Sequence, residues 1–234
     1  MVGRWLGTAS AGSVMTKRLV IVGNGQMAEV FHSHFTHSTD FRVAGFAVDR
    51  NFINAVHLVG LPVVPFEEVE SHFAPGSFHA FVAIGPVQNN AVRAARFLEL
   101  RRKSYRFANF ISPQAVVSAT ATLGENVTVG PLAMVSPWAR IGDNVLVGSA
   151  SCIGHHCQVH SHAFLTLNVV MAGSVVIGER AFIGTGAVIR DNVTIGEGSV
   201  IGAGSTILGD VEPNTVYASP GAKPLPMRAD QARL

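Results

Sequence analysis

The chain has few charged residues, few cysteines and no long apolar run. Asp, Glu, Lys and Arg make up 14% of its 234 residues, against about 25% in an average soluble domain. The formal net charge is only +2, and no basic stripe is interleaved with aromatics, so nucleic acid is not an expected partner. No apolar run approaches the ~18 residues of a membrane span, so we expect no membrane-spanning helix. Low charge content fits a protein that packs much of its surface against partner subunits.

The two cysteines, Cys152 and Cys157, are five residues apart. That spacing matches neither a disulfide framework nor a CxxC metal or redox pair, so we expect reduced thiols in a cytoplasmic protein. Residues 1–14 contain one Arg and no sustained apolar stretch, whereas a secretory signal needs one. We therefore expect residues 1–17 to be a disordered extension.

The C-terminal half is built on a six-residue repeat. From Val117 to Ile207 every sixth residue is aliphatic, which makes sixteen consecutive positions without an insertion. The residue two positions before each is small or Val, and Gly follows nine of the sixteen. An α-helix would smear a period of six around its surface, and hairpin sheets need turn signals every 8–12 residues. Six-residue strand-and-turn units predict a parallel β-helix, with glycine permitting the corner.

Residues 115–209 resemble the hexapeptide-repeat acyltransferases, whose signature is an aliphatic residue, Gly, two variable residues, a small residue and one more. The resemblance implies a left-handed helix with three hexapeptides per coil, since the pattern itself does not set the hand. It also implies a trimer.

The first part of the chain alternates between strand and helix patterns. Arg18–Val22 is predicted to be a buried strand, and the GxGxxA turn Gly23–Ala28 then opens a helix. Phe41–Val48 is a second strand that ends at Asp49, 24 residues after Gly25. Glycines and a helix N-terminus suit a diphosphate, and an acid at this distance suits a ribose. The pattern indicates a nucleotide site, although a tight strand–helix turn without a ligand shares it.

Further elements complete a small domain. Pro62 and Pro65 bracket a short third segment, and the strand Phe78–Ile84 is followed by Gly85. Gln88–Lys103 is predicted to be a helix, with basic residues at its C-terminus. Only about 90 residues precede the repeat, so the second mononucleotide half of an NAD domain is missing.

The order of these two parts resembles the sialic-acid O-acetyltransferase family, which includes N-acetyltransferases of UDP-4-amino sugars in bacillosamine-type pathways. The resemblance implies an acetyl-CoA-dependent acetyltransferase of a nucleotide-linked amino sugar for surface-glycan biosynthesis. It implies a homotrimer with the acyl-CoA slot between the β-helices of neighbouring subunits. It also implies that no metal is needed. The expected parts are the extension 1–17, a Rossmann-like α/β nucleotide-sugar domain 18–109, a left-handed parallel β-helix 110–224 and a tail 225–234.

The family holds its nucleotide-sugar in the N-terminal domain. By resemblance, the candidate substrate contacts are Gly23, Gly25, Gln26, Asp49, Gly85 and Asn90. Family members often carry His where Gln26 stands, and the loop after Gly85 is longer here.

Histidines 155, 156, 160 and 162 cluster in one coil. Acyl transfer needs a base for the acceptor proton, and histidine suits that task. Repeat phase puts His155 and His156 at an outer corner. The family's catalytic His stands in Ile-Glu-His-Glu/Asp-Cys, which here reads Ile-Gly-His-His-Cys. The resemblance makes His155 the base, with His156 replacing the acid that usually orients it. We expect His160 and His162 to be exposed.

A coil of 18 residues predicts that Gly173 lies directly above His155, where the family's backbone N–H contacts the acyl carbonyl. Thr185 and Ala203 fall at family positions that line the CoA slot. In Ser219–Lys223, which varies the family's Gly-x-Pro-Ala-Lys, Lys223 is expected to meet a CoA phosphate.

Other functions stay open at this point. One is O-acetylation of a sialic-acid-like sugar, and another is a non-catalytic nucleotide-sugar-binding trimeric scaffold. A metal-dependent hydratase would resemble the γ-type carbonic anhydrases, which need two His five apart and a third two coils earlier. His155 and His160 meet the first condition, but Ala119 stands at the third position.

Overall fold

The computed structural model describes residues 16–221. The first fifteen residues of the predicted extension, the predicted tail and Lys223 lie outside the described residues. The described residues form two compact units. The first comprises residues 16–84 together with 99–108, and the second comprises 85–98 together with 109–221.

The first unit is an α/β domain around a six-stranded sheet of order β3-β4-β2-β1-β5-β6. All neighbouring strands are parallel except β3 and β4. Its strands are β1 (Lys17–Val22), β2 (Phe41–Val48), β3 (His57–Leu58), β4 (Leu61–Pro65), β5 (His79–Val82) and β6 (Arg106–Phe107). Its helices are α1 (Gln26–Ser38), η1 (Arg50–Phe52), η2 (Phe66–Glu68), α2 (Val69–His72) and the end of α3 (Ala91–Arg102).

Apolar burial explains this sheet. The inner strand β1 is a run of aliphatic residues, Leu19 to Val22, all buried, as a strand covered on both faces requires. α1 packs Phe31 and Phe35 onto Phe81 of β5, with ring centroids 4.6 Å and 4.9 Å apart. The predicted strands over Arg18–Val22 and Phe41–Val48 are thus confirmed, and β1 begins one residue early. The helix predicted from Gln88 begins at Ala91 instead.

That later start has a backbone cause. Gln88, Asn89 and Asn90 adopt φ values of 49°, 49° and 66°. Three successive residues in the left-handed region cannot join a right-handed helix. They form a turn before α3, in the part of the chain that belongs to the second unit.

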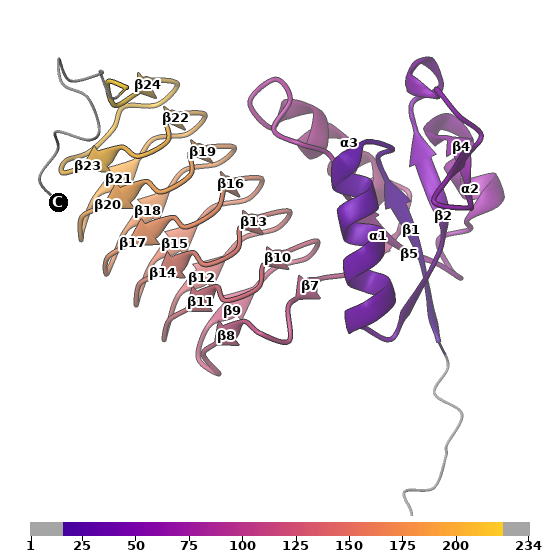
Figure 1. Ribbon diagram of the computed structural model, residues 1–234, viewed down its shortest axis with the longest axis horizontal. Coiled ribbons are helices and arrows are strands. Elements are labelled where there is room, and N and C mark those ends of the chain that lie inside the picture. The colour runs from indigo at the N-terminus through magenta and orange to yellow at the C-terminus, as the bar shows by residue number, and fades with distance from the viewer. Residues whose placement is uncertain (1–15, 222–234) are drawn as a thin grey trace, which may run out of the picture. The chain divides into compact units, whose positions relative to one another are not determined.

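The second unit is a left-handed parallel β-helix with three sheets, and Figure 1 shows its coils stacked from β7 to β24. The seven-stranded sheet holds β7 (Phe110–Ile111), β10 (Thr128–Val129), β13 (Leu146–Val147), β16 (Phe164–Leu165), β19 (Phe182–Ile183), β22 (Val200–Ile201) and β24 (Val216–Tyr217). The six-stranded sheet holds β8 (Val116–Val117), β11 (Met134–Val135), β14 (Cys152–Ile153), β17 (Val170–Met171), β20 (Val188–Ile189) and β23 (Thr206–Ile207). The five-stranded sheet holds β9 (Thr122–Leu123), β12 (Arg140–Ile141), β15 (Gln158–Val159), β18 (Val176–Ile177) and β21 (Thr194–Ile195).

The predicted register is confirmed. Ile153 pairs with Met171, and Met171 with Ile189, so each coil takes 18 residues. The aliphatic and small positions of the repeat form one core inside the prism. The last coil is two residues shorter, because Ile201 pairs with Tyr217.

The glycines have a different role from the predicted one. The left-handed corner residue lies two positions after the glycine, as at His156, with φ 58°, rather than at Gly154. Glycine is needed at 154 because an added Cβ would lie 2.8 Å from the carbonyl oxygen of Met171 in the next coil. These glycines therefore permit close stacking of coils, while polar residues such as Asn144 take the left-handed turn.

Candidate active site at a corner of the β-helix

His155 and His156 lie at the corner between β14 and β15. Ile153 before them and Cys157 after them are buried in the prism, so the turn between must project outward. Both histidines are exposed. Their backbone is anchored in the stack, because the N–H of Ser174 donates to the carbonyl of His155 at 2.8 Å.

The two imidazoles are hydrogen-bonded to each other. The Nδ1 atoms of His155 and His156 lie 3.1 Å apart, and the rings meet edge to face with centroids 5.3 Å apart. A bond between two imidazole nitrogens needs one donor and one acceptor. If His155 donates from Nδ1, its Nε2 has a free lone pair, which is the tautomer that a general base needs.

Gly173 lies directly above His155, one coil later. A Cβ added at Gly173 would lie 2.6 Å from Nε2 and 3.0 Å from Nδ1 of His155. The carbonyl of Gly173 accepts from the N–H of Asn192 at 3.0 Å, while its own N–H donates to no group among residues 16–221. His155 therefore lies beside a backbone donor that a ligand can use.

Trp138 lies beneath His156, one coil earlier, and repeat phase would have identified it. The two rings are stacked, with centroids 4.9 Å apart and planes 26° apart. The N–H of His156 donates to the carbonyl of Pro137 at 3.1 Å, and the N–H of Trp138 to Oγ1 of Thr120 at 3.2 Å. A column of corner residues thus runs from Thr120 through Trp138 to His156, and Trp138 and His156 are left-handed, with φ values of 59° and 58°.

A groove of about 500 Å³ runs beside this column. Its lining residues are Thr120, Thr122, Trp138, Arg140, His156, Gln158 and Ser174. No sequence signal selects Arg140 and Gln158, because their strand positions are variable in the repeat. The groove places a cation, an amide and an indole within reach of the histidine pair.

Thr185 and Ala203 lie at a different corner from the histidines. Thr185 stands between β19 and β20, and Ala203 between β22 and β23, where the seven-stranded sheet turns into the six-stranded sheet. The two stack on each other, since the carbonyl of Thr185 accepts from the N–H of Gly204 at 2.8 Å. Within one prism, the six-stranded sheet separates them from His155.

In the first unit, Gly23, Gly25 and Gln26 form the turn from β1 into α1, and Asp49 follows β2. A Cβ at Gly23 would lie 2.7 Å from the carbonyl oxygen of Ala83, so Gly23 serves packing. Gly25 is exposed with nothing within 4 Å of its Cβ position, and no side chain caps α1. The helix N-terminus is therefore open at the carboxyl edge of the sheet, where such domains bind anions.

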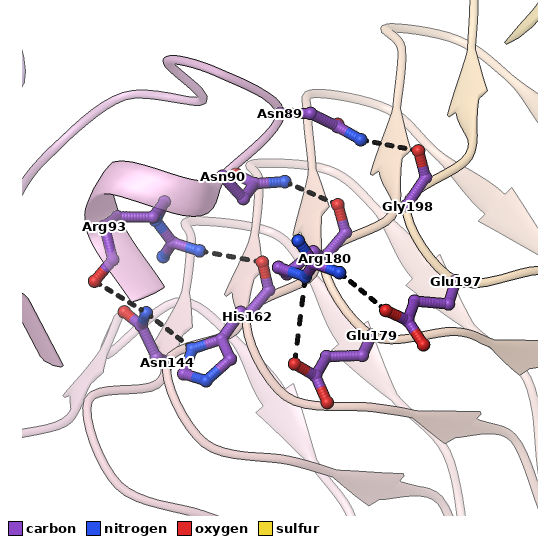
Figure 2. A network of polar contacts seen from close by, with 9 residues as sticks. All are labelled: Asn89, Asn90, Arg93, Asn144, His162, Glu179, Arg180, Glu197 and Gly198. Carbon is purple, nitrogen blue, oxygen red and sulfur yellow. Dashed lines mark hydrogen bonds and ion pairs between the residues drawn. The ribbon is translucent and has the colours of Figure 1, made fainter. Parts of the chain in front are cut away.

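The remaining two candidates belong to the second unit. Gly85 accepts a hydrogen bond from the N–H of Val87 at 2.8 Å. Asn90 is fully buried, and its Nδ2 donates to the carbonyl of Arg180 at 3.0 Å. Figure 2 shows this contact among those that attach residues 89–93 to a corner of the β-helix. Asn90 therefore has a structural role.

The prediction that His162 is exposed is wrong, whereas His160 is exposed. His162 is 5% exposed, and its Nδ1 lies 2.9 Å from Nδ2 of Asn144. Its carbonyl accepts from Nη1 of Arg93 at 3.1 Å (Figure 2). Burial lowers the pKa of Arg93 to about 9. His162 is part of a buried polar network and not of the active corner.

Two further findings concern metal binding and membrane crossing. Within residues 16–221, no group of three or more His, Cys, Asp or Glu side chains is arranged to hold a metal ion. No helix in the described part of the chain has the length and apolar character needed to cross a bilayer.

Family models match both parts of the chain. Residues 18–100 match the PglD N-terminal domain, and residues 120–155 and 174–209 match the bacterial transferase hexapeptide repeats. The predicted resemblance and fold are therefore confirmed. A comparison with curated proteins gives no match.

Solved structures that include two acetyltransferases are similar over most of the chain. The Caulobacter crescentus enzyme PerB, in complex with CoA and GDP-perosamine, is 28% identical, with a TM-score of 0.78 over 86% of this chain and 93% of that one. The acetyltransferase domain of PglB from Neisseria gonorrhoeae, in complex with acetyl coenzyme A, is 26% identical, with a TM-score of 0.79 over 90% of this chain and 100% of that one. WeeI from Acinetobacter baumannii, 21% identical with a TM-score of 0.73 over 87% of this chain and 97% of that one, shares the fold.

Proposed function

We propose that this protein is an acetyl-CoA-dependent N-acetyltransferase of a nucleotide-linked amino sugar, serving surface-glycan biosynthesis. The match of its two parts to the PglD N-terminal domain and to bacterial transferase hexapeptide repeats supports the proposal. The observation that carries the proposal is the corner where His155 lies beneath the backbone of Gly173. The similar enzymes PerB and PglB support the choice of donor and of an amino acceptor. PerB has also been solved with one histidine replaced by asparagine or by alanine.

His155 is the general base in this proposal. Its Nε2 takes the proton from the acceptor nitrogen as that nitrogen attacks the thioester carbonyl and the C–N bond forms. The N–H of Gly173 donates to the oxyanion of the tetrahedral intermediate. The C–S bond then breaks, and His155 returns the proton to the departing thiolate of CoA. His156 accepts the Nδ1–H of His155 and so keeps Nε2 unprotonated before attack.

The open N-terminus of α1 supports a site for the nucleotide diphosphate. Gly25 and Gln26 expose backbone N–H groups there, and Asp49 follows the neighbouring strand. We assign substrate binding to Gly25, Gln26 and Asp49. Gly23 allows the turn, and Asp49 is the ribose-binding acid.

The positions of the two corners support a homotrimer. Thr185 and Ala203, the proposed CoA-slot residues, cannot meet His155 of the same prism across the six-stranded sheet. The outward residues of that sheet include Val116, Met134, Val170 and Val188, which are all exposed. An exposed apolar face of this kind marks an interface. A neighbouring copy packed there would bring its own corner to His155, with the acyl-CoA slot between them.

The test is release of CoA thiol from acetyl-CoA with a panel of UDP-, GDP- and dTDP-linked 4-amino sugars. Mass analysis of the product, with the matching hydroxy sugars as comparison, separates N- from O-acetylation. We expect acetylation of an amine, and a trimeric protein without transfer to any amino sugar would contradict the proposal.

His155→Ala tests the base. Loss of a general base typically costs about 10²–10⁴-fold in rate. We therefore expect kcat to fall by that factor while the affinity for acetyl-CoA stays the same. The control is His160→Ala, which changes an exposed histidine in the same coil and should remain within several-fold of the parent. A folded His155→Ala enzyme with parent-like kcat would remove His155 from the mechanism.

A further inference from the structure

The partner of the proposed base is an imidazole and not a carboxylate. A carboxylate presents an acceptor oxygen in either orientation. An imidazole presents a nitrogen to His155 only while Nδ1 faces it, and a flip of the ring would present a carbon there instead. The ring of His156 must therefore be held in one orientation, although it is exposed and belongs to a turn.

Trp138 is the side chain that contacts the face of His156. The rings are nearly parallel, 26° apart, with centroids at 4.9 Å. Trp138 is 57% exposed, so burial of its indole in the core does not explain its presence. The residues one coil below and one coil above this pair in the same column are small, Thr120 and Ser174.

We propose that Trp138 is a positioning residue, which stacks on His156 and keeps Nδ1 of His156 facing Nδ1 of His155. This inference rests on the proposed function. The backbone that carries the indole is itself anchored, because its N–H donates to Oγ1 of Thr120 and because Pro137 precedes it. Pro137 also accepts the backbone N–H of His156 at 3.1 Å, so one turn holds both the ring and the backbone.

The indole also suits the charge that the reaction creates. When His155 takes the acceptor proton, the histidine pair becomes a cation. The residues that line the adjoining groove include no acid, and Arg140 and His155 are the charged or titratable groups that face His156 there. The face of Trp138 supplies a cation–π contact where the family has a carboxylate.

A double-mutant cycle tests the role. Trp138→Leu should lower kcat about tenfold with both KM values within about twofold, whereas Trp138→Phe, which keeps a stacking ring, should retain most activity. In a His156→Glu background the partner is a carboxylate that needs no orientation. There, Trp138→Leu should change kcat by no more than about twofold.

Leu132→Ala is the matched control. Leu132 is also large, 71% exposed and left-handed, with φ 60°, but it lies at another corner of the β-helix. It should leave kcat unchanged. Parent-like kcat in Trp138→Leu would overturn the proposal, as would an equal loss in both backgrounds, because that loss would not act through His156.

Fluorescence tests the contact apart from catalysis. The chain has two tryptophans, so Trp5→Phe leaves Trp138 as the single indole. The imidazole of His156 stacked on this indole should quench its emission, so His156→Gln should raise the emission at constant pH. Equal emission from the two proteins would overturn the stack. An enzyme inactive on every amino sugar would overturn the proposed function, while this comparison of emission would still decide the contact.

Discussion

The imidazole of His155 occupies space that a side chain at position 173 would need. Gly173 lacks a Cβ, so the ring lies against its backbone, where an added carbon would come within 2.6 Å of Nε2. The same residue presents the N–H that we assign to the oxyanion. Base and oxyanion donor are therefore coupled through one position, and a change at 173 acts on both.

Gly173→Ala should therefore displace His155. A misplacement of about 1 Å can cost about 100-fold, so we expect kcat to fall about 10- to 100-fold in a folded protein. Gly209→Ala is the control, because Gly209 lies two coils later at the same corner with nothing within 4 Å of its Cβ position. Steady-state kinetics on both variants checks this, and equal kcat in the two would contradict the geometry.

At the scale of the elements, hydrogen-bonded polar side chains form a ladder along the corner between the five-stranded and seven-stranded sheets. Asn126 donates to Asn144 at 2.8 Å, and Asn144 bonds His162 at 2.9 Å. The ring of Phe97, from α3, packs edge-on against His162 at 5.5 Å. This ladder stabilises the fold, in contrast to the exposed corner that carries His155.

His162→Ala should weaken the fold rather than the chemistry. It removes a buried ring and one partner of Asn144, which together cost about 2–4 kcal/mol. His160→Ala should change the free energy of unfolding by less than about 0.5 kcal/mol, since His160 is exposed. Urea unfolding of both variants measures the difference. Equal midpoints would mean that the ladder contributes nothing to stability.

The start of α1 gives a prediction for substrate binding. Gly25→Val puts a branched side chain into open space at the helix N-terminus, where the diphosphate must approach. The acceptor KM should rise about tenfold or more, while the acetyl-CoA KM stays the same. Gly76→Val, at another open glycine of the same unit, is the control. Unchanged acceptor kinetics in a folded Gly25→Val protein would refute the assignment.

For the whole molecule, the six-stranded sheet is the proposed subunit interface. Val170→Lys places a charge in the proposed interface, and its desolvation should break the trimer. Light scattering should then report a smaller particle, and activity should be lost with it. Thr194→Lys, at an exposed position on the five-stranded sheet, should remain trimeric and active. A Val170→Lys protein that keeps both mass and activity would exclude this face.

The sequence by itself determined the β-helix, and the family resemblance added the 18-residue coil that stacks His155 under Gly173. It could do so because each coil repeats the same local pattern, so that sequence distance converts directly into position. The strands around the glycine turn were predictable for a similar reason, since buried strands are continuous apolar runs.

Only the tertiary structure decided which histidine is buried. His160 and His162 share one turn, yet His162 is covered by residues such as Arg93, which is 69 positions away in the chain. Likewise, the pairing of Trp138 with His156 depends on which way two side chains turn at one corner. The repeat sets where each Cα lies, but side-chain packing against distant segments sets what each residue does.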